Sequence, residues 1–412
     1  MTTEPLPAPL PDRAAGDVVV SGLVALAVAM GIGRFAFTPL LPLMMRDGTL
    51  TAAAGAEWAA ANYGGYLVGA LTAARFAADP RRGLLLSLLG VALTTLAAAG
   101  IDGAAAAPLG AVLRAAAGAF SAWSLVCASS WCLAELARLR VPQRGAWIYA
   151  GVGLGIALTG TLAWLGGRQR ADRLWLELGL AAGAGALFVW SRVRARRPAP
   201  GEAQARAATR GRAAAAAPGP GRAPSGLVLC YGIFGFGYIV PATFLPAMAR
   251  EFAPDPLVFG LTWPLFGLAA ALSVAAVAQW LPEAPRRRLW ACAQGLMALG
   301  VALPLAVQAL WATVASAVLV GGTFMVVTMA GLQLAREERP DDPTPLLARM
   351  TGAFAAGQIA GPLLVRLLGP GRWAGWDALS GTGAAAALLL GLTAAWLWRV
   401  PQPCPVPARQ PR

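Results

Sequence analysis

The feature that most constrains the fold is a series of apolar runs, each long enough to cross a membrane and separated by short polar breaks. A helix rises 1.5 Å per residue, so about 20 apolar residues span the roughly 30 Å hydrocarbon layer of a bilayer. The breaks at 79–83, 142–144 and 285–288 combine Pro with Arg, which ends a helix and keeps a charge in water. Because 58% of the residues are hydrophobic and only 13% are charged, the sequence predicts a multi-pass membrane protein.

Twelve transmembrane helices are expected, at residues 18–45, 56–78, 83–101, 108–136, 145–166, 174–192, 226–250, 257–281, 288–308, 311–336, 346–368 and 376–398. The stretch from Arg192 to Arg222 holds eight Arg residues among Pro and Gly, which is typical of a solvated linker; a headgroup-binding or partner-binding segment is the alternative. The predicted domains are a tail at 1–17, a six-helix bundle at 18–192, a basic linker at 193–225, a second six-helix bundle at 226–398 and a tail at 399–412.

The basic residues predict an orientation. All 33 are Arg, and most lie in the loops that alternate along one side of the predicted spans. Basic loops are retained in the cytoplasm, so we expect the linker and both termini on the cytoplasmic side of the inner membrane. The net charge of +14 would also suit nucleic acid, but the Arg residues lie between apolar runs. The expected partner is therefore the lipid bilayer and no nucleic acid.

The two halves of the sequence are internally similar. Residues 31–46 and 235–250 align at an offset of 204 with six identities in sixteen positions, and the break at 80–82 recurs at 285–287. Transporter folds are often built from such duplicated halves. In this alignment Tyr238 corresponds to Arg34.

Three strings carry a family resemblance: GIGRFAFTPLLPLM at 31–44, NYGGYLVGAL at 62–71 and GQIAGPLL at 357–364. They resemble the YbfB/YjiJ branch of the major facilitator superfamily, over about residues 18–398. The resemblance implies an all-α membrane protein with twelve transmembrane helices in two parallel six-helix pseudo-repeats. It also implies secondary active transport of a small solute by alternating access of the two halves.

No set of catalytic residues is visible. The chain has no His, and its five Cys form no C-x-x-C pair, which excludes His triads and the usual zinc sites. Glu57, Glu135, Glu177 and Asp377 lie near predicted helix ends, where we expect them to be solvated. We therefore expect a monomeric carrier that is not an enzyme, with no cofactor and no metal, and with either a coupled proton or an exchanged solute beside its substrate.

Arg34 is the leading candidate for substrate binding. Counted from a helix start near Val18, it lies roughly 24 Å along the first span, too deep for its guanidinium to reach the interface easily. It therefore faces either the central cavity, which we favour, or the backbone carbonyls of a neighbouring helix. An Arg in the cavity would favour an anionic solute.

Arg114 lies about 9 Å into the fourth helix, so extension of its side chain to the interface is equally plausible. The neutral candidates for contact with the solute are Asn62, Tyr63, Tyr66, Tyr149, Tyr238, Trp263, Gln294, Gln333 and Gln358. Of these we select Asn62, Tyr63, Tyr238 and above all Gln358, which glycines flank; an interhelical hydrogen bond is the alternative for Gln358.

Glycines spaced for close helix contact or gating are Gly31, Gly33, Gly65, Gly69, Gly151, Gly155, Gly357 and Gly361. Two alternatives to an anion transporter remain: an exporter of neutral solutes or drugs, of the sugar or multidrug type, and a membrane sensor that has the fold without transport. A sensor would need an additional soluble domain, which the short polar linker does not supply.

Overall fold

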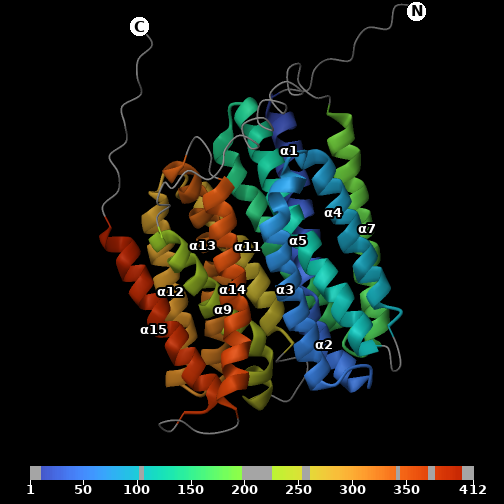
Figure 1. The fold of residues 1–412 in the computed structure, drawn as a ribbon, viewed down its shortest axis with the longest axis vertical. Helices are drawn as coiled ribbons and strands as arrows, with labels where there is room; N and C mark the ends of the chain where they lie inside the picture. Colours follow the sequence, from blue (N-terminus) through green and yellow to red (C-terminus); the bar gives the residue numbers. More distant parts are fainter. Residues whose placement is uncertain are drawn as a thin grey trace, which may run out of the picture.

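The computed structural model describes residues 11–101, 106–196, 225–252, 260–339, 344–369 and 376–400. Figure 1 shows these residues as a bundle of long helices that run roughly along one direction. Most of the predicted linker at 193–225 and nearly all of the predicted tail at 399–412 lie outside the described residues.

The first half starts with a broken span, in which α1 (Pro11–Leu26), the π-helix η1 (Ala27–Phe35) and α2 (Phe37–Arg46) follow one another. It continues with α3 (Ala52–Ala77), α4 (Pro80–Ala98), α5 (Ala106–Arg138), the 3₁₀-helix η3 (Pro142–Tyr149), α6 (Ala150–Leu165) and α7 (Ala171–Ala195). The second half holds α9 (Ser225–Phe252), α11 (Thr262–Trp280), α12 (Arg286–Ala306), α13 (Leu310–Glu338), α14 (Thr344–Leu368) and α15 (Ala378–Arg399). Each predicted span overlaps one of these helices or helix runs.

Eleven of the described helices or runs are long and apolar enough to cross a membrane. The helix α3 is not among them, because Glu57, Asn62, Tyr63 and Tyr66 lower its hydropathy. It is nevertheless 26 residues long and packs against α5 and α14 inside the bundle. A helix that neighbours enclose can carry polar groups that lipid would not tolerate.

The two halves have the same internal arrangement. In the first half α4 packs on α5 and α7, and in the second α12 packs on α13 and α15. The first helix run of each half also packs on an equivalent helix, which is α6 for η1 in the first half and α14 for α9 in the second. The halves meet through two equivalent pairs, α3 with α14 and α11 with α6. The predicted fold, twelve helices in two parallel six-helix pseudo-repeats, is confirmed.

The start of α1 and the ends of α7 and α15 lie toward one end of the bundle in Figure 1. We call this the linker end, defined by Pro11, Ala195 and Arg399. The first helix begins at Pro11, before the predicted start of the first span at residue 18. Proline is common in the first turn of a helix, and the negative charge of Asp12 in that turn interacts favourably with the positive end of the helix dipole.

The outer surface shows where lipid would contact the protein. Leucines such as Leu93, Leu180, Leu272 and Leu388 are exposed on the flanks of their helices. Exposed tryptophans stand near helix ends: Trp280 and Trp398 at the linker end, Trp311 and Trp376 at the opposite end. Tryptophans at two levels with leucines between them are typical of a membrane-spanning surface.

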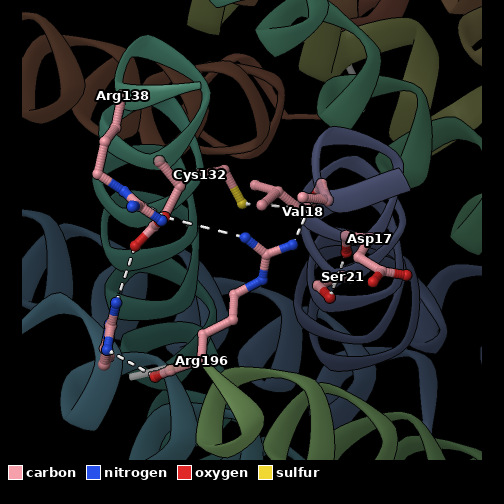
Figure 2. A network of polar contacts seen from close by, with 9 residues as sticks. Asp17, Val18, Ser21, Cys132, Arg138 and Arg196 are labelled. Carbon is pink, nitrogen blue, oxygen red and sulfur yellow. Dashed lines mark hydrogen bonds and ion pairs between the residues drawn. The ribbon is translucent and has the colours of Figure 1, made fainter. Parts of the chain in front are cut away.

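A cluster of charged residues ties the helices of the first half together near the linker end (Figure 2). Glu135 accepts hydrogen bonds from Arg81 (2.8 Å) and Arg138 (2.8 Å), and Arg196 lies 3.9 Å from it. Arg196 also donates to the Ala14 carbonyl of α1. The expectation that Glu135 is solvated is therefore wrong: only 4% of its side chain is exposed, because three Arg side chains surround it.

The second half repeats the main element of this cluster. Arg287 at the start of α12 donates to Glu338 at the end of α13. Arg81 and Glu135 occupy the corresponding ends of α4 and α5. Each half therefore closes its linker end with an ion pair between equivalent helices.

Candidate functional site

The site is built on the π-helix η1, in the middle of the first span. All of its residues except Ala27 are buried. A Cβ atom at Gly31 would lie 2.3 Å from the Gly155 Cα, so η1 and α6 approach backbone to backbone. A π-helical stretch widens the turn and redirects side chains, and such stretches are frequent at functional sites. Here the stretch carries Arg34 in its last turn.

Arg34 points between the two halves. Its side chain is 3% exposed, and its Nη2 donates a hydrogen bond to Gln358 Oε1 on α14. The Gln358 Nε2 in turn donates to the hydroxyl of Tyr238 on α9. A chain of hydrogen bonds therefore runs from the first half to the second through Arg34, Gln358 and Tyr238.

The face of the Arg34 guanidinium rests on an aromatic ring. Its Cζ lies 3.8 Å from the centre of the Tyr66 ring, and 5.3 Å and 5.7 Å from those of Phe35 and Phe354. Cation–π contacts of this kind stabilise a buried guanidinium by about 0.5–2 kcal/mol. They leave its edge, where the N–H groups point, available for an acceptor.

The charge of Arg34 is not balanced within the described residues. Its Nε and Nη1 are buried without a hydrogen-bond partner. No described Asp or Glu forms an ion pair with Arg34, and Gln358 is a neutral acceptor. A buried cation with unused donors is unfavourable unless an anion pairs with it.

Arg114 is used differently. Only 4% of its side chain is exposed, and it donates to the backbone carbonyls of Gly33 (3.0 Å, from Nη1) and Arg34 (2.8 Å, from Nη2). Pro39 lies about one turn further on, and because proline has no backbone N–H it cannot donate a hydrogen bond to the carbonyls at the end of η1. Arg114 thus supports the end of η1 and holds Arg34 in place. The interface position that we considered for Arg114 is wrong, because backbone carbonyls of η1 bind its guanidinium inside the bundle.

The other selected residues surround this arrangement unevenly. Asn62 donates to the Arg114 carbonyl (2.9 Å), so it fixes α3 to α5. Tyr63 is partly buried and lies beside Thr243 of α9. Tyr238 is fully buried, with its ring stacked on those of Phe324 and Phe354, each at 5.5 Å. The geometry brings Arg34, Gln358 and Tyr238 together, while Asn62 and Arg114 form the layer behind Arg34.

Cavities lie between the halves among the described residues, and two of them bear on the site. The central one, of about 20 Å³, is lined by Arg34, Tyr66, Tyr238 and Phe354 among others, and it is too small for an organic solute. The larger one, of about 310 Å³, lies toward the linker end, between Gln143, Arg286 and Gln333. Toward the opposite end, Phe35 contacts Trp263 and Phe324 with ring centres 6.4 Å and 6.1 Å apart. The central cavity is therefore too small for a solute, and the larger cavity lies on its linker-end side.

Phe324 and Phe354 were not predicted as site residues. A phenylalanine in an apolar run has no feature that separates a cavity wall from ordinary core. Gln294, which we considered, is bonded to Trp290 and Thr393 between α12 and α15, away from the cavity.

The glycines predicted for packing or gating lie at contacts within each half. Gly65 and Gly69 lie against α5, Gly151 and Gly155 against the first span, and Gly357 and Gly361 against α9; Gly33 faces Ser121 and Val91, and Gly31 faces Gly155. The tightest contacts between the halves use other glycines, Gly153 and Gly267. Gly153 stands in the same alternating run as Gly151 and Gly155 but on the opposite side of α6.

Comparison with known proteins places this geometry in a family. A family model described as an uncharacterised MFS-type transporter, YbfB, matches residues 26–396. No curated protein matches the chain. Among solved structures, a D-xylose-proton symporter has a TM-score of 0.71 and 11% identity, covering 93% of this chain and 97% of its own. The human organic anion transporter MFSD10 (TETRAN) has a TM-score of 0.65 and 18% identity, covering 95% and 100%. Identities this low show a shared fold alone.

Proposed function

The chain belongs to the YbfB-like transporters of the major facilitator superfamily, and from this premise we propose that it carries a small organic anion across the cytoplasmic membrane by alternating access of its two halves. The anion binds at Arg34. The observation that carries the proposal is the buried, unpaired guanidinium of Arg34 at the meeting point of both halves.

The charge of Arg34 is unfavourable inside the bilayer. A charged side chain at the centre of a bilayer costs about 2.5–3.5 kcal/mol on insertion scales, and more when its donors have no acceptor. An anionic group at the guanidinium would supply acceptors and cancel the charge together. A neutral solute would supply acceptors only. The site therefore favours an anion over a neutral molecule of similar shape.

The two cavities fit a transport cycle. In the closed conformation the central space is too small for a solute, so Arg34 becomes reachable only when the halves move apart. The larger cavity between Gln143, Arg286 and Gln333 lies toward the linker end, where we propose the cytoplasm lies. Arg286 there lies 3.8 Å from Glu337, which balances part of its charge.

A neutral solute remains the second candidate, because one specific feature favours it. The rings of Tyr66, Tyr238, Phe324 and Phe354 form an aromatic wall, which sugars and apolar drugs also contact. In that case Arg34 would contribute a hydrogen bond rather than a charge.

Uptake into proteoliposomes tests the proposal. Labelled lactate, succinate and benzoate are compared with glucose, each with and without a pH gradient, which also reveals coupling to protons. Arg34→Gln should abolish anion uptake, and Arg34→Lys should raise the half-saturation concentration because it keeps the charge and loses the planar fork. Arg75→Gln, which removes an exposed Arg of α3, is the matched control. Unchanged anion uptake by Arg34→Gln at normal protein level would make the anion proposal wrong.

A further inference from the structure

Gln358 occupies the position on Arg34 that an anion needs. We propose that Gln358 is an internal ligand of Arg34, which a carboxylate on the solute displaces, so that solute binding breaks the hydrogen-bond chain between the halves. This inference rests on the proposed function, because it takes the solute to be an anion bound at Arg34. Gln358 then competes with the solute for Arg34 and is not itself a contact of the solute.

The geometry of a guanidinium supports this assignment. A carboxylate binds it with two parallel hydrogen bonds, either to Nη1 and Nη2 or to Nε and Nη2. Both arrangements require Nη2. In the closed conformation Nη2 donates to Gln358, whereas Nε and Nη1 have no partner within the described residues. A carboxylate can thus form its two-bonded contact only after Gln358 has left.

The surroundings of Arg34 restrict the approach further. The ring of Tyr66 covers one face of the guanidinium at 3.8 Å, so the ligand must come in the plane of the group, where the N–H bonds point. A flat carboxylate fits this approach. The amide of Gln358, which comes from α14 of the other half, already lies on that edge.

The exchange is favourable because the two acceptors differ in charge. Hydrogen bonds between ionised partners are roughly twice as strong as neutral ones, and the amide leaves the Arg34 charge uncompensated. Once displaced, Gln358 no longer joins η1 to α14, and its bond to Tyr238 remains within the second half. Solute binding and the closed contact between the halves therefore compete for one nitrogen atom, Arg34 Nη2. Each weakens the other by the same factor, because a coupling between two binding events is reciprocal.

The test uses substitutions of Gln358 in the full-length protein, purified in detergent. Gln358→Leu removes the internal ligand, and Gln358→Met does the same with a side chain of similar length if the Leu variant folds poorly. Gln358→Glu replaces the neutral ligand by a charged one. Gln294→Leu removes another buried amide, away from the site, and serves as the control. Dissociation constants for lactate, succinate and benzoate are obtained from thermal unfolding at increasing ligand concentration, with glucose as the neutral probe.

We expect Gln358→Leu to bind the carboxylate about tenfold more tightly, since the ligand no longer displaces an internal bond to a charged group. Gln358→Glu should abolish carboxylate binding. Without any probe, Gln358→Glu should also unfold at a higher temperature than the wild type, because its carboxylate pairs with Arg34 and can accept a bond from Tyr238. Gln294→Leu should leave the dissociation constant unchanged.

The outcomes separate this inference from the proposed function. If the wild type responds to a carboxylate through Arg34, and Gln358→Leu weakens binding as Arg34→Gln does, then Gln358 is a direct ligand and the inference is wrong. If Gln358→Glu binds the carboxylate as well as the wild type, or unfolds no higher than Gln358→Leu, the inference is also wrong. If no carboxylate stabilises the wild type, the proposed function itself fails.

Discussion

The contact between α6 and α11 gives the most direct test of how the two halves move. Gly153 of α6 faces Gly267 and Ala271 of α11, where a Cβ atom at Gly153 would lie 2.3 Å from the Ala271 nitrogen and 2.7 Å from the Gly267 oxygen. Both are backbone atoms, so no side-chain rotation can relieve the clash. Gly153→Ala should therefore disfavour the closed conformation specifically.

The magnitude follows from the distances. Ordinary contact at a Cβ starts at 3.4 Å, so the two helices must separate by about 1 Å to accept the methyl group. Overpacking of this size costs about 1–3 kcal/mol, which corresponds to roughly a 5- to 150-fold change in an equilibrium between conformations. The three atoms nearest to the new Cβ all belong to α11, so the first half itself should stay folded.

Distances between spin labels at positions 75 of α3 and 349 of α14 report the separation of the halves near the linker end, with Cys292 and Cys404 replaced by Ser. Both labelled positions are exposed. Gly153→Ala should shift the distance distribution away from that of the wild type and slow any transport that passes through the closed state. The control is Gly183→Ala, because a Cβ there would meet no atom within 4 Å. Identical distributions for Gly153→Ala and Gly183→Ala would show that the α6–α11 contact does not limit closure.

Three further predictions address orientation and stability. Reporter fusions after residue 210 and at the C-terminus should both give cytoplasmic signals, because basic loops stay inside; an external signal at either would reverse the orientation. Arg140→Gly should raise the free energy of unfolding by about 1 kcal/mol, since Arg140 adopts a φ of 60° just after α5, and an unchanged melting temperature would contradict this. Glu135→Gln should lower the free energy of unfolding by about 1–3 kcal/mol, because the substitution removes the carboxylate that faces the part-buried Arg81 and Arg196. The control is Glu177→Gln, at an exposed residue of α7. An equal effect of the two substitutions would refute the role of the cluster.

The fold was predictable because bilayer thickness sets the length of each span and Pro-Arg breaks mark its ends. The start of α1 was missed because Pro11 and Asp12 suggested a polar tail, although the same residues suit the first turn of a helix. The burial of Glu135 was missed for a different reason. Its partners Arg81 and Arg196 are distant in the sequence, and only the packing of α4, α5 and the end of α7 brings them together.

The site was predictable only in part. The depth of Arg34 in an apolar run indicated a functional residue, and Gln358 was selected for its flanking glycines. Neither pattern could indicate that the two side chains bond to each other, because they are 324 residues apart. The role of Arg114 depends on the π-helix, whose carbonyls at Gly33 and Arg34 accept its hydrogen bonds. Hydrophobic periodicity does not separate a π-helical turn from an α-helical one in a run buried on every side.

The duplication also explains why the site carries a charge on one side only. Arg34 and Tyr238 occupy equivalent positions in the two halves, and they are the two ends of the chain that passes through Gln358. Two Arg residues at these positions would face each other across the centre and repel. With Tyr238 in the second half, the cation lies on η1 and an aromatic stack lies opposite, formed by Tyr238, Phe324 and Phe354. We therefore expect a bound solute to turn its anionic group toward the first half and its apolar part toward the second.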